Sequence, residues 1–211
     1  MPVHFLGENH NKEGNPVANS IAFVLGSPRK KGNTRGIAAV TMEVARENDS
    51  EVDVVDVTEL DFKKPGCVGC QKCQQSKEFA CSIGDQLGQT VATLPKYDVI
   101  VMATPLYWWG YPAQIKMFVD RMYSLTKFTD SDEIQTVLAG KTLALLATAL
   151  GPVENNLELL EQQWKNAADI LQCPFMSCMF PNTPLQGGDL VKDSDAIEKA
   201  KEFGRLLSSV K

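Results

Sequence analysis

The sequence predicts an α/β fold in which one parallel sheet of five strands carries helices on both faces. Short apolar runs rich in β-branched residues alternate along the chain with stretches whose apolar residues recur at helical spacing. Glycine and proline cluster in the connections between them. Because a right-handed crossover through a helix places successive strands parallel in one sheet, this alternation predicts a doubly wound sheet with strand order 2-1-3-4-5.

Each strand is expected where an apolar run is too short for a helix and is bounded by turn residues. The first run reads IAFVLG and suits a strand buried on both faces, and a valine-rich second run suits another largely buried strand. The expected strands span residues 21–26, 51–57, 98–103, 141–147 and 175–180. The expected helices follow them at residues 34–45, 85–95, 112–125, 157–171 and 193–207.

The length of 211 residues suits a single domain, expected over residues 21–211 with a cysteine-rich loop at 66–82. Apolar residues make up 44% and charged residues 22%, which is the composition of a globular protein. Residues 1–20 hold four asparagines and show no sustained periodicity. We expect them to form a flexible arm or one that drapes over another subunit.

Charge and residue usage exclude several functional classes. The net charge of −5 and the absence of a long basic run argue against nucleic-acid binding. No apolar run is long enough to span a bilayer, and no signal segment is visible, so we expect a cytoplasmic protein without disulfides. The only histidines, His4 and His10, precede the first strand, which makes a histidine-based triad or metal site improbable.

The loop after the first strand, with the sequence GSPRKKGNT, predicts a phosphate site. Where a short loop joins a strand to the N-terminus of a helix, several backbone N–H groups and the positive end of the helix dipole point into one small volume. The loop matches neither the pattern for nucleoside triphosphates nor the GxGxxG pattern for dinucleotides. Ser27, Asn33 and Thr34 offer mostly neutral donors, which suit one terminal phosphate of a mononucleotide such as FMN. The alternative is an ordinary capped turn with a solvated basic loop.

The second informative stretch is C-x2-C-x2-C-x7-C, formed by Cys67, Cys70, Cys73 and Cys81. Three cysteines at intervals of three, with a more distant fourth, place thiolates as an iron-sulfur cluster requires. Structural zinc uses two separated pairs more often, but a zinc ion held by four thiolates and a loop of free thiols remain alternatives. Cys173 and Cys178 are expected to be small buried residues.

Two further loops follow strands whose carboxyl ends should meet the phosphate loop. The loop PLYWWGYP after the third strand is dense in aromatic residues, which can stack on a planar ring, although a subunit interface or the core would explain them as well. The loop after the fourth strand contains Thr148 and Gly151. Asp56, near the end of the second strand, is interpreted as an ordinary polar residue at a strand end, because the dinucleotide glycines are missing.

Three motifs together, GSPRKKGNT, CVGCQKC and PLYWWGYPAQIKMFVDR, resemble the NADPH-dependent FMN reductase family and, within it, the iron-sulfur flavoproteins. The resemblance covers about residues 20–208 and implies a flavodoxin-like fold. It implies an FMN-phosphate loop, a flavin-ring loop and a less specific third loop, and it implies that the four clustered cysteines bind a metal cluster. The implied FMN-binding residues are Ser27, Arg29, Asn33 and Thr34, then Pro105, Leu106, Tyr107 and Trp108, then Thr148 and Gly151.

The resemblance also implies an FMN-dependent NAD(P)H oxidoreductase, in which a nicotinamide reduces the flavin and a quinone, flavin or protein accepts the electrons, with a [4Fe-4S] cluster as a candidate outlet. No catalytic side chain is expected, because the flavin carries the chemistry. A non-enzymatic electron carrier or redox sensor is the alternative. Exposed Trp108, Trp109 and Tyr111 would form an apolar patch, so we expect a homodimer or homotetramer.

Overall fold

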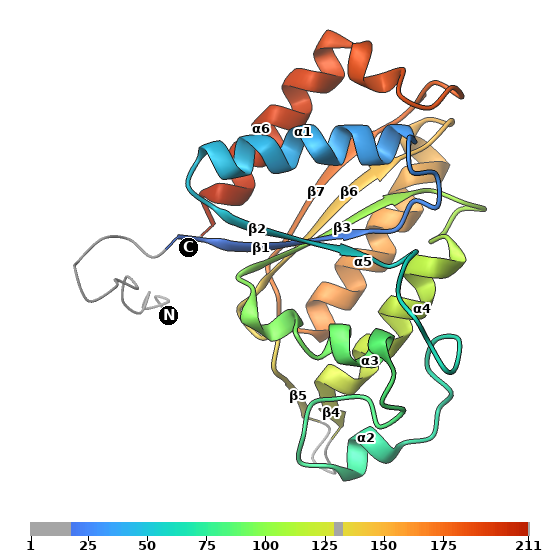
Figure 1. Cartoon of the computed structure of the whole chain (residues 1–211), viewed down its shortest axis with the longest axis vertical. Helices are drawn as coiled ribbons and strands as arrows, with labels where there is room; N and C mark the ends of the chain where they lie inside the picture. The colour runs from blue at the N-terminus through green and yellow to red at the C-terminus, as the bar shows by residue number, and fades with distance from the viewer. Residues whose placement is uncertain (1–17, 129–132, 211) are drawn as a thin grey trace.

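The computed structural model describes residues 18–128 and 133–210, which form a three-layered α/β arrangement (Figure 1). The central sheet has five parallel strands in the order β2-β1-β3-β6-β7, which confirms the predicted order 2-1-3-4-5. The strands of this sheet are β1 (Ser20–Leu25), β2 (Glu51–Asp56), β3 (Val99–Pro105), β6 (Thr142–Thr148) and β7 (Phe175–Phe180).

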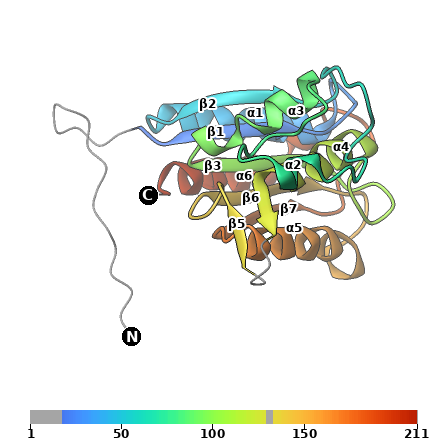
Figure 2. The same cartoon turned by 90° about the horizontal axis from the view of Figure 1, so that it is seen from below.

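Helices cover both faces of the sheet, as Figures 1 and 2 show. On one face α1 and α6 pack with residues such as Phe23 and Val101, and on the other α3, α4 and α5 pack with residues such as Val24 and Ile100. The α-helices are α1 (Asn33–Glu47), α2 (Lys72–Gln75), α3 (Gln86–Val91), α4 (Ala113–Arg121), α5 (Glu158–Ile170) and α6 (Ser194–Ser208). Short helical turns lie at Leu94–Lys96, Met122–Leu125, Val153–Leu157 and Leu190–Lys192.

Burial explains the continuous apolar runs of the three central strands. Successive side chains of a strand point to opposite faces, and here each face lies under helices, so both sets are buried. The prediction that the second strand is largely buried was wrong. β2 is the edge strand, and Val54 remains half exposed.

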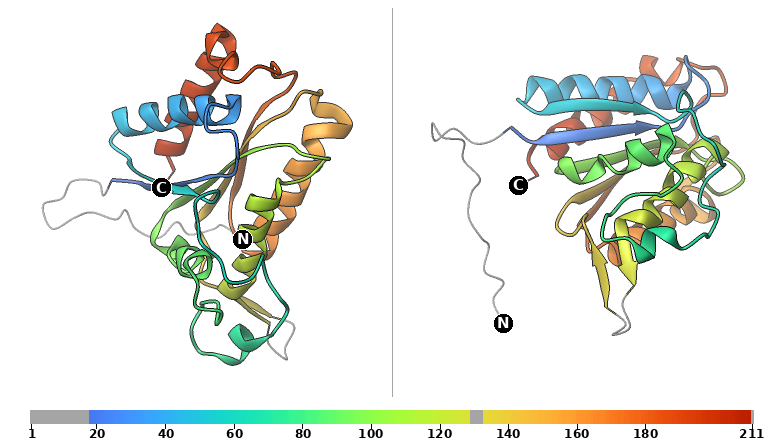
Figure 3. Two further views of the ribbon diagram at one scale, coloured as in Figure 1. Left: turned by 45° about the vertical axis from the view of Figure 1, so that its right-hand side comes forward. Right: turned by 60° about the horizontal axis from the view of Figure 1, so that its bottom comes forward.

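A small antiparallel hairpin, β4 (Thr126–Phe128) with β5 (Ile134–Thr136), was not predicted from the sequence. Strands of three residues are too short to show a period of two. The hairpin lies beside α2, and Figure 3 shows that the segment between β2 and α3 loops away from the sheet to reach it. The side chain of Gln74 joins the two by donating to the carbonyl of Thr126 at 3.0 Å.

The carboxyl ends of β1, β3 and β6 meet at one edge of the sheet. The N–H of Gly26 donates to the carbonyl of Ala103 at 2.9 Å, and the N–H of Leu106 donates to the carbonyl of Thr148 at 2.8 Å. Three loops that are far apart in the sequence are thereby held side by side, at the edge where ligands of doubly wound sheets bind.

Most of the expected N-terminal arm, residues 1–17, lies outside the described residues. Among the helices of residues 18–128 and 133–210, none is both long enough and apolar enough to cross a bilayer.

Candidate functional site

The loop after β1 leaves the N-terminus of α1 open to an anion. Gly32 occupies the cap position, and no side chain accepts from the N–H groups of the first turn, which also carries no acidic residue. The buried hydroxyl of Thr34 lies 2.7 Å from that of Thr148, so the loops after β1 and β6 are joined there. A Cβ on Gly32 would come within 2.9 Å of the carbonyl of Arg29, so glycine keeps this turn tight. The result is a small polar volume lined by Ser27, Thr34 and free N–H groups.

Asn33 holds a second segment against this loop. Its side-chain amide donates to the carbonyls of Pro184 and Gln186 at 2.7 and 3.0 Å, and its side-chain oxygen accepts from the N–H of Leu190 at 3.1 Å. Arg29 donates to the carbonyl of Leu185 at 3.2 Å. The side chains of Asn33 and Arg29 therefore anchor residues 184–190 in this structure, whereas their place in the loop motif predicts that they bind the phosphate.

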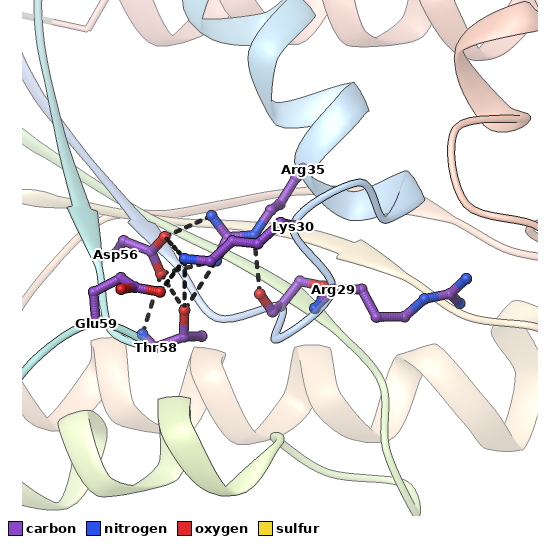
Figure 4. A network of polar contacts seen from close by, with 7 residues as sticks. Arg29, Lys30, Arg35, Asp56, Thr58 and Glu59 are labelled. Carbon is purple, nitrogen blue, oxygen red and sulfur yellow. Dashed lines mark hydrogen bonds and ion pairs between the residues drawn. The ribbon is translucent and has the colours of Figure 1, made fainter.

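Two cations of the loop region converge on the carboxylate of Asp56 (Figure 4). Arg35 forms a bidentate pair with it at 2.7 and 2.8 Å, and Lys30 approaches it at 3.0 Å and also pairs with Glu59. Burial raises the pKa of Asp56, but the hydrogen bonds from Arg35 and Thr58 hold it well below its usual range. Asp56 is thus the polar strand-end residue that the sequence predicted, and it neutralises part of the positive charge beside the phosphate loop.

The aromatic loop after β3 is a tight turn with unusual backbone conformations. Tyr107 and Gly110 exchange two backbone hydrogen bonds of 3.0 Å, and Trp108 and Trp109 between them have φ values of 48° and 56°. Turns of this kind favour asparagine and glycine, because other side chains are strained at positive φ. The Trp108 side chain is 91% exposed. Two adjacent tryptophans at positive φ, with exposed fractions of 91% and 50%, thus present aromatic surface at this edge of the sheet.

Two buried polar atoms in the loops after β3 and β6 have no hydrogen-bond partner in the described part of the chain. They are Tyr111 Oη and Asn156 Oδ1. Tyr111 packs edge to face on Trp164, so the expectation that it is exposed beside the two tryptophans was wrong, and burial raises the pKa of its phenol. Asn156 packs on Gly151, where a Cβ would come within 2.9 Å of its Nδ2. Because buried polar groups are rarely left unpaired, these atoms favour a ligand with polar edges at this end of the sheet.

The four clustered cysteines line one small cavity of about 20 Å³, together with Arg121. The loop bends there through Gly66, Gly69 and Gln71, all at positive φ. Within the described ranges, no three cysteine, histidine or acidic side chains approach closely enough to share one metal ion. A tetrahedral zinc requires such an approach, whereas in an iron-sulfur cube each cysteine binds a different iron and the thiolates stand farther apart. The four thiols line this one cavity without being drawn together around a single point.

Arg121 ties α4 to this cysteine loop. Its side chain is 1% exposed, forms an ion pair with the buried Asp85 at 2.9 Å, and donates to Cys81 Sγ at 3.1 Å. It also donates to the carbonyls of Gly66 and Lys64. Burial raises the pKa of Asp85, but the hydrogen bonds from Arg121 and from the N–H groups of Gly88 and Lys63 together outweigh it and lower that pKa to about 2. The first and last parts of the cysteine motif are held together by this one guanidinium group.

The helix α4 connects the aromatic turn to the cysteine loop. It begins three residues after Gly110 and ends at Arg121, and nine helical residues span about 13 Å at 1.5 Å per residue. The two chemically distinctive loops of the chain are thus attached to opposite ends of one short helix.

A model of the NADPH-dependent FMN reductases matches residues 19–183 of this chain. The chain belongs to that family. Among curated relatives, an iron-sulfur flavoprotein of Methanosarcina thermophila is 33% identical over 107 residues, covering 51% of this chain and 54% of the relative. One of Methanocaldococcus jannaschii is 29% identical over 98 residues, covering 46% and 49%. The chain therefore matches about half the length of these curated relatives.

The fold of this FMN reductase family member agrees with solved structures. An NAD(P)H:quinone oxidoreductase from Methanothermobacter marburgensis superposes with a TM-score of 0.68, covering 90% of this chain and 98% of that one at 15% identity. At this identity the likeness concerns the fold alone. The resemblance inferred from the three motifs is confirmed at the level of the family.

The structure brings the predicted FMN reductase residues together at one edge of the sheet. Ser27 lies on the loop after β1, Thr34 lies in the first turn of α1, Pro105 ends β3, and Thr148 ends β6. Sequence reasoning missed Arg121, Asp85 and Asn156 as constituents of the sites. Arg121 and Asp85 are 36 residues apart, so no local pattern pairs them.

Proposed function

We propose that this chain is an FMN-dependent NAD(P)H oxidoreductase that passes electrons from a nicotinamide to a quinone, a flavin or a protein. The observation that carries the proposal is the uncapped N-terminus of α1, where the buried hydroxyls of Ser27 and Thr34 line a volume suited to one phosphate. Membership of the FMN reductase family supports the same ligand.

The residues present fit FMN in three respects. The α1 N-terminus with Ser27, Thr34 and Thr148 offers one phosphate cradle, and no second phosphate motif accompanies it as FAD would need. The segment Pro105 to Trp108 offers backbone groups and aromatic surface for the ring. The unpaired Tyr111 Oη and Asn156 Oδ1 offer partners for polar ring edges, and Gly151 leaves room for Asn156.

Bound FMN would supply the chemistry by accepting a hydride and releasing electrons to the acceptor. The protein would bind the phosphate, hold the ring against the aromatic turn and leave one face open for the nicotinamide. No side chain of this site needs to act as an acid or a base.

We expect the purified protein to release FMN on denaturation and to oxidise NADPH or NADH in the presence of a quinone, free flavin or ferricyanide. Chromatography of the released cofactor and steady-state loss of nicotinamide absorbance measure the two properties. Full FMN loading without turnover of any acceptor would instead favour the electron carrier. Release of FAD would contradict the single-phosphate site.

For the cysteine loop we propose a [4Fe-4S] cluster held by Cys67, Cys70, Cys73 and Cys81. The support is their convergence on one cavity, the positive-φ turns at Gly66 and Gly69, and the N–H of Gly69 directed at Cys67 Sγ at 3.4 Å. The curated relatives named above are described as iron-sulfur flavoproteins. Such a cluster could take electrons singly from a two-electron donor.

We further propose a homodimer or homotetramer, in a reducing compartment such as the cytoplasm that suits six free thiols. An open apolar groove of about 540 Å³ lies between the cysteine loop, α4 and α5, and includes the exposed Phe128 and Ile170. Trp108 and Trp109 add further exposed apolar surface that a subunit interface would cover. A second copy of the chain is the occupant we favour.

A further inference from the structure

The guanidinium group of Arg35 lies between the phosphate loop and the end of β2 (Figure 4). Its two terminal nitrogens donate to the two oxygens of Asp56 at 2.7 and 2.8 Å, and its Nε donates to the backbone carbonyl of Ser27 at 2.9 Å. Planar bidentate pairs of this kind fix orientation as well as distance. Arg35 therefore connects the side chain of Asp56, at the end of β2, to the backbone of the loop that follows the neighbouring strand β1.

Asp56 is itself held in place. Its Oδ1 accepts from the N–H and the hydroxyl of Thr58 at 3.1 and 2.7 Å, and its backbone lies opposite Leu25 in the parallel register of β1 and β2. The Arg35 side chain is 12% exposed and that of Asp56 is 22% exposed, so water competes only weakly for the pair. Asp56 thus serves as a rigid support from which Arg35 reaches the loop.

The restraint acts on the residue that orients the phosphate cradle. Ser27 is buried, and its hydroxyl accepts from the N–H of Arg29 at 3.3 Å, within the turn that leads to Gly32. Fixing the carbonyl of Ser27 fixes the peptide plane from which this turn begins. The direction of the following N–H groups depends on that plane.

The charge balance separates this role from direct attraction of a phosphate. Arg35 and Asp56 together carry no net charge, and Arg35 directs its Nε and both terminal nitrogens at Ser27, Asp56 and Thr58. A cation that is paired in this way fixes the shape of the phosphate loop and adds little positive potential to it.

We propose that Arg35 and Asp56 are positioning residues that hold the phosphate loop in the shape by which the protein distinguishes FMN from riboflavin, which lacks the phosphate. This inference rests on the proposed FMN site and adds to it the residues that set its selectivity.

The test compares the dissociation constants of FMN and riboflavin for the flavin-free full-length protein, measured by flavin fluorescence. We expect Arg35→Met and Asp56→Asn each to weaken FMN about tenfold or more, which corresponds to about 1.4 kcal/mol, while riboflavin changes less than about twofold. The matched control is Asp53→Asn, which removes a carboxylate from the same strand that accepts from Tyr97 Oη at 2.7 Å, away from the loop. It should leave both constants unchanged.

Arg35→Met removes a positive charge and Asp56→Asn removes a negative one, so together they separate positioning of the loop from attraction of the phosphate. Asp56→Asn retains the charges of Arg35 and Lys30 and removes the carboxylate that pairs with both, so tighter FMN binding in that variant would mean that these cations act by attraction and would overturn the proposal. Equal weakening of FMN and riboflavin, accompanied by a lower melting temperature, would assign the pair to general stability and would also overturn it. Unchanged FMN selectivity in both variants would overturn the positioning role alone. A wild-type protein that binds neither flavin would overturn the proposed function with it.

Discussion

Replacing Arg121 with methionine is expected to destabilise the protein by about 3–5 kcal/mol. The variant leaves the carboxylate of Asp85, whose side chain is 2% exposed, without its cationic partner inside the protein. It also leaves the carbonyls of Gly66 and Lys64 and the thiol of Cys81 without their donor. Denaturant unfolding of the purified variant and the wild type gives the difference in free energy directly.

Two comparisons make this result specific to the buried pair. Arg205→Met removes an exposed arginine that pairs with Glu198 at 3.2 Å, and should change stability by less than about 1 kcal/mol. Adding Asp85→Asn to Arg121→Met removes the stranded charge while its amide oxygen can still accept from the N–H of Gly88, so the double variant should recover part of the loss. A single Arg121→Met variant as stable as the wild type would show that the pair does not hold the cysteine loop.

Replacing Cys70 with alanine is expected to abolish cluster binding. Wild-type protein purified under strict anaerobiosis should contain about four iron and four sulfide per chain, and the variant should contain neither, because it leaves one iron of the cube without its thiolate. Elemental analysis and the absorption spectrum measure the change.

The control for this variant is Cys178→Ala. Cys178 is buried in β7, far in sequence from the loop, and its pKa is raised to about 11 by burial, so it is a core residue as predicted. Its replacement should leave the iron content intact. One zinc per chain in the wild type, without iron, would show that the four cysteines form a zinc site and not a cluster site. FMN without iron or zinc would leave a loop of free thiols.

Much of the fold could be predicted because its signal is local. The runs IAFVLG and VIVMAT are buried on both faces of the sheet, and a strand buried on both faces has a continuous apolar sequence. The order of the strands followed from the regular alternation with helices. The hairpin β4–β5 could not be predicted in the same way, because its strands have three residues each.

Site residues could be predicted where their role follows from the local sequence. They could not be predicted as well where their role depends on partners far away in the sequence. Ser27 and Thr34 lie at the helix N-terminus that their loop predicts. The amide of Asn33 looked equally available, but residues more than 150 positions away occupy it. The pairs Arg121–Asp85 and Arg35–Asp56 likewise join elements that only the tertiary fold brings together.

The central claim is that the chain binds FMN and reduces it with a nicotinamide. The most direct test is anaerobic mixing of the FMN-loaded protein with NADPH or NADH while the absorption of oxidised flavin is followed. We expect that absorption to disappear as the nicotinamide is oxidised, with one equivalent consumed per flavin when the cysteine loop carries no cluster and more when a cluster also takes electrons, and to return when a quinone is added. A flavin that stays oxidised in the presence of both nicotinamides would contradict the assignment as an NAD(P)H oxidoreductase.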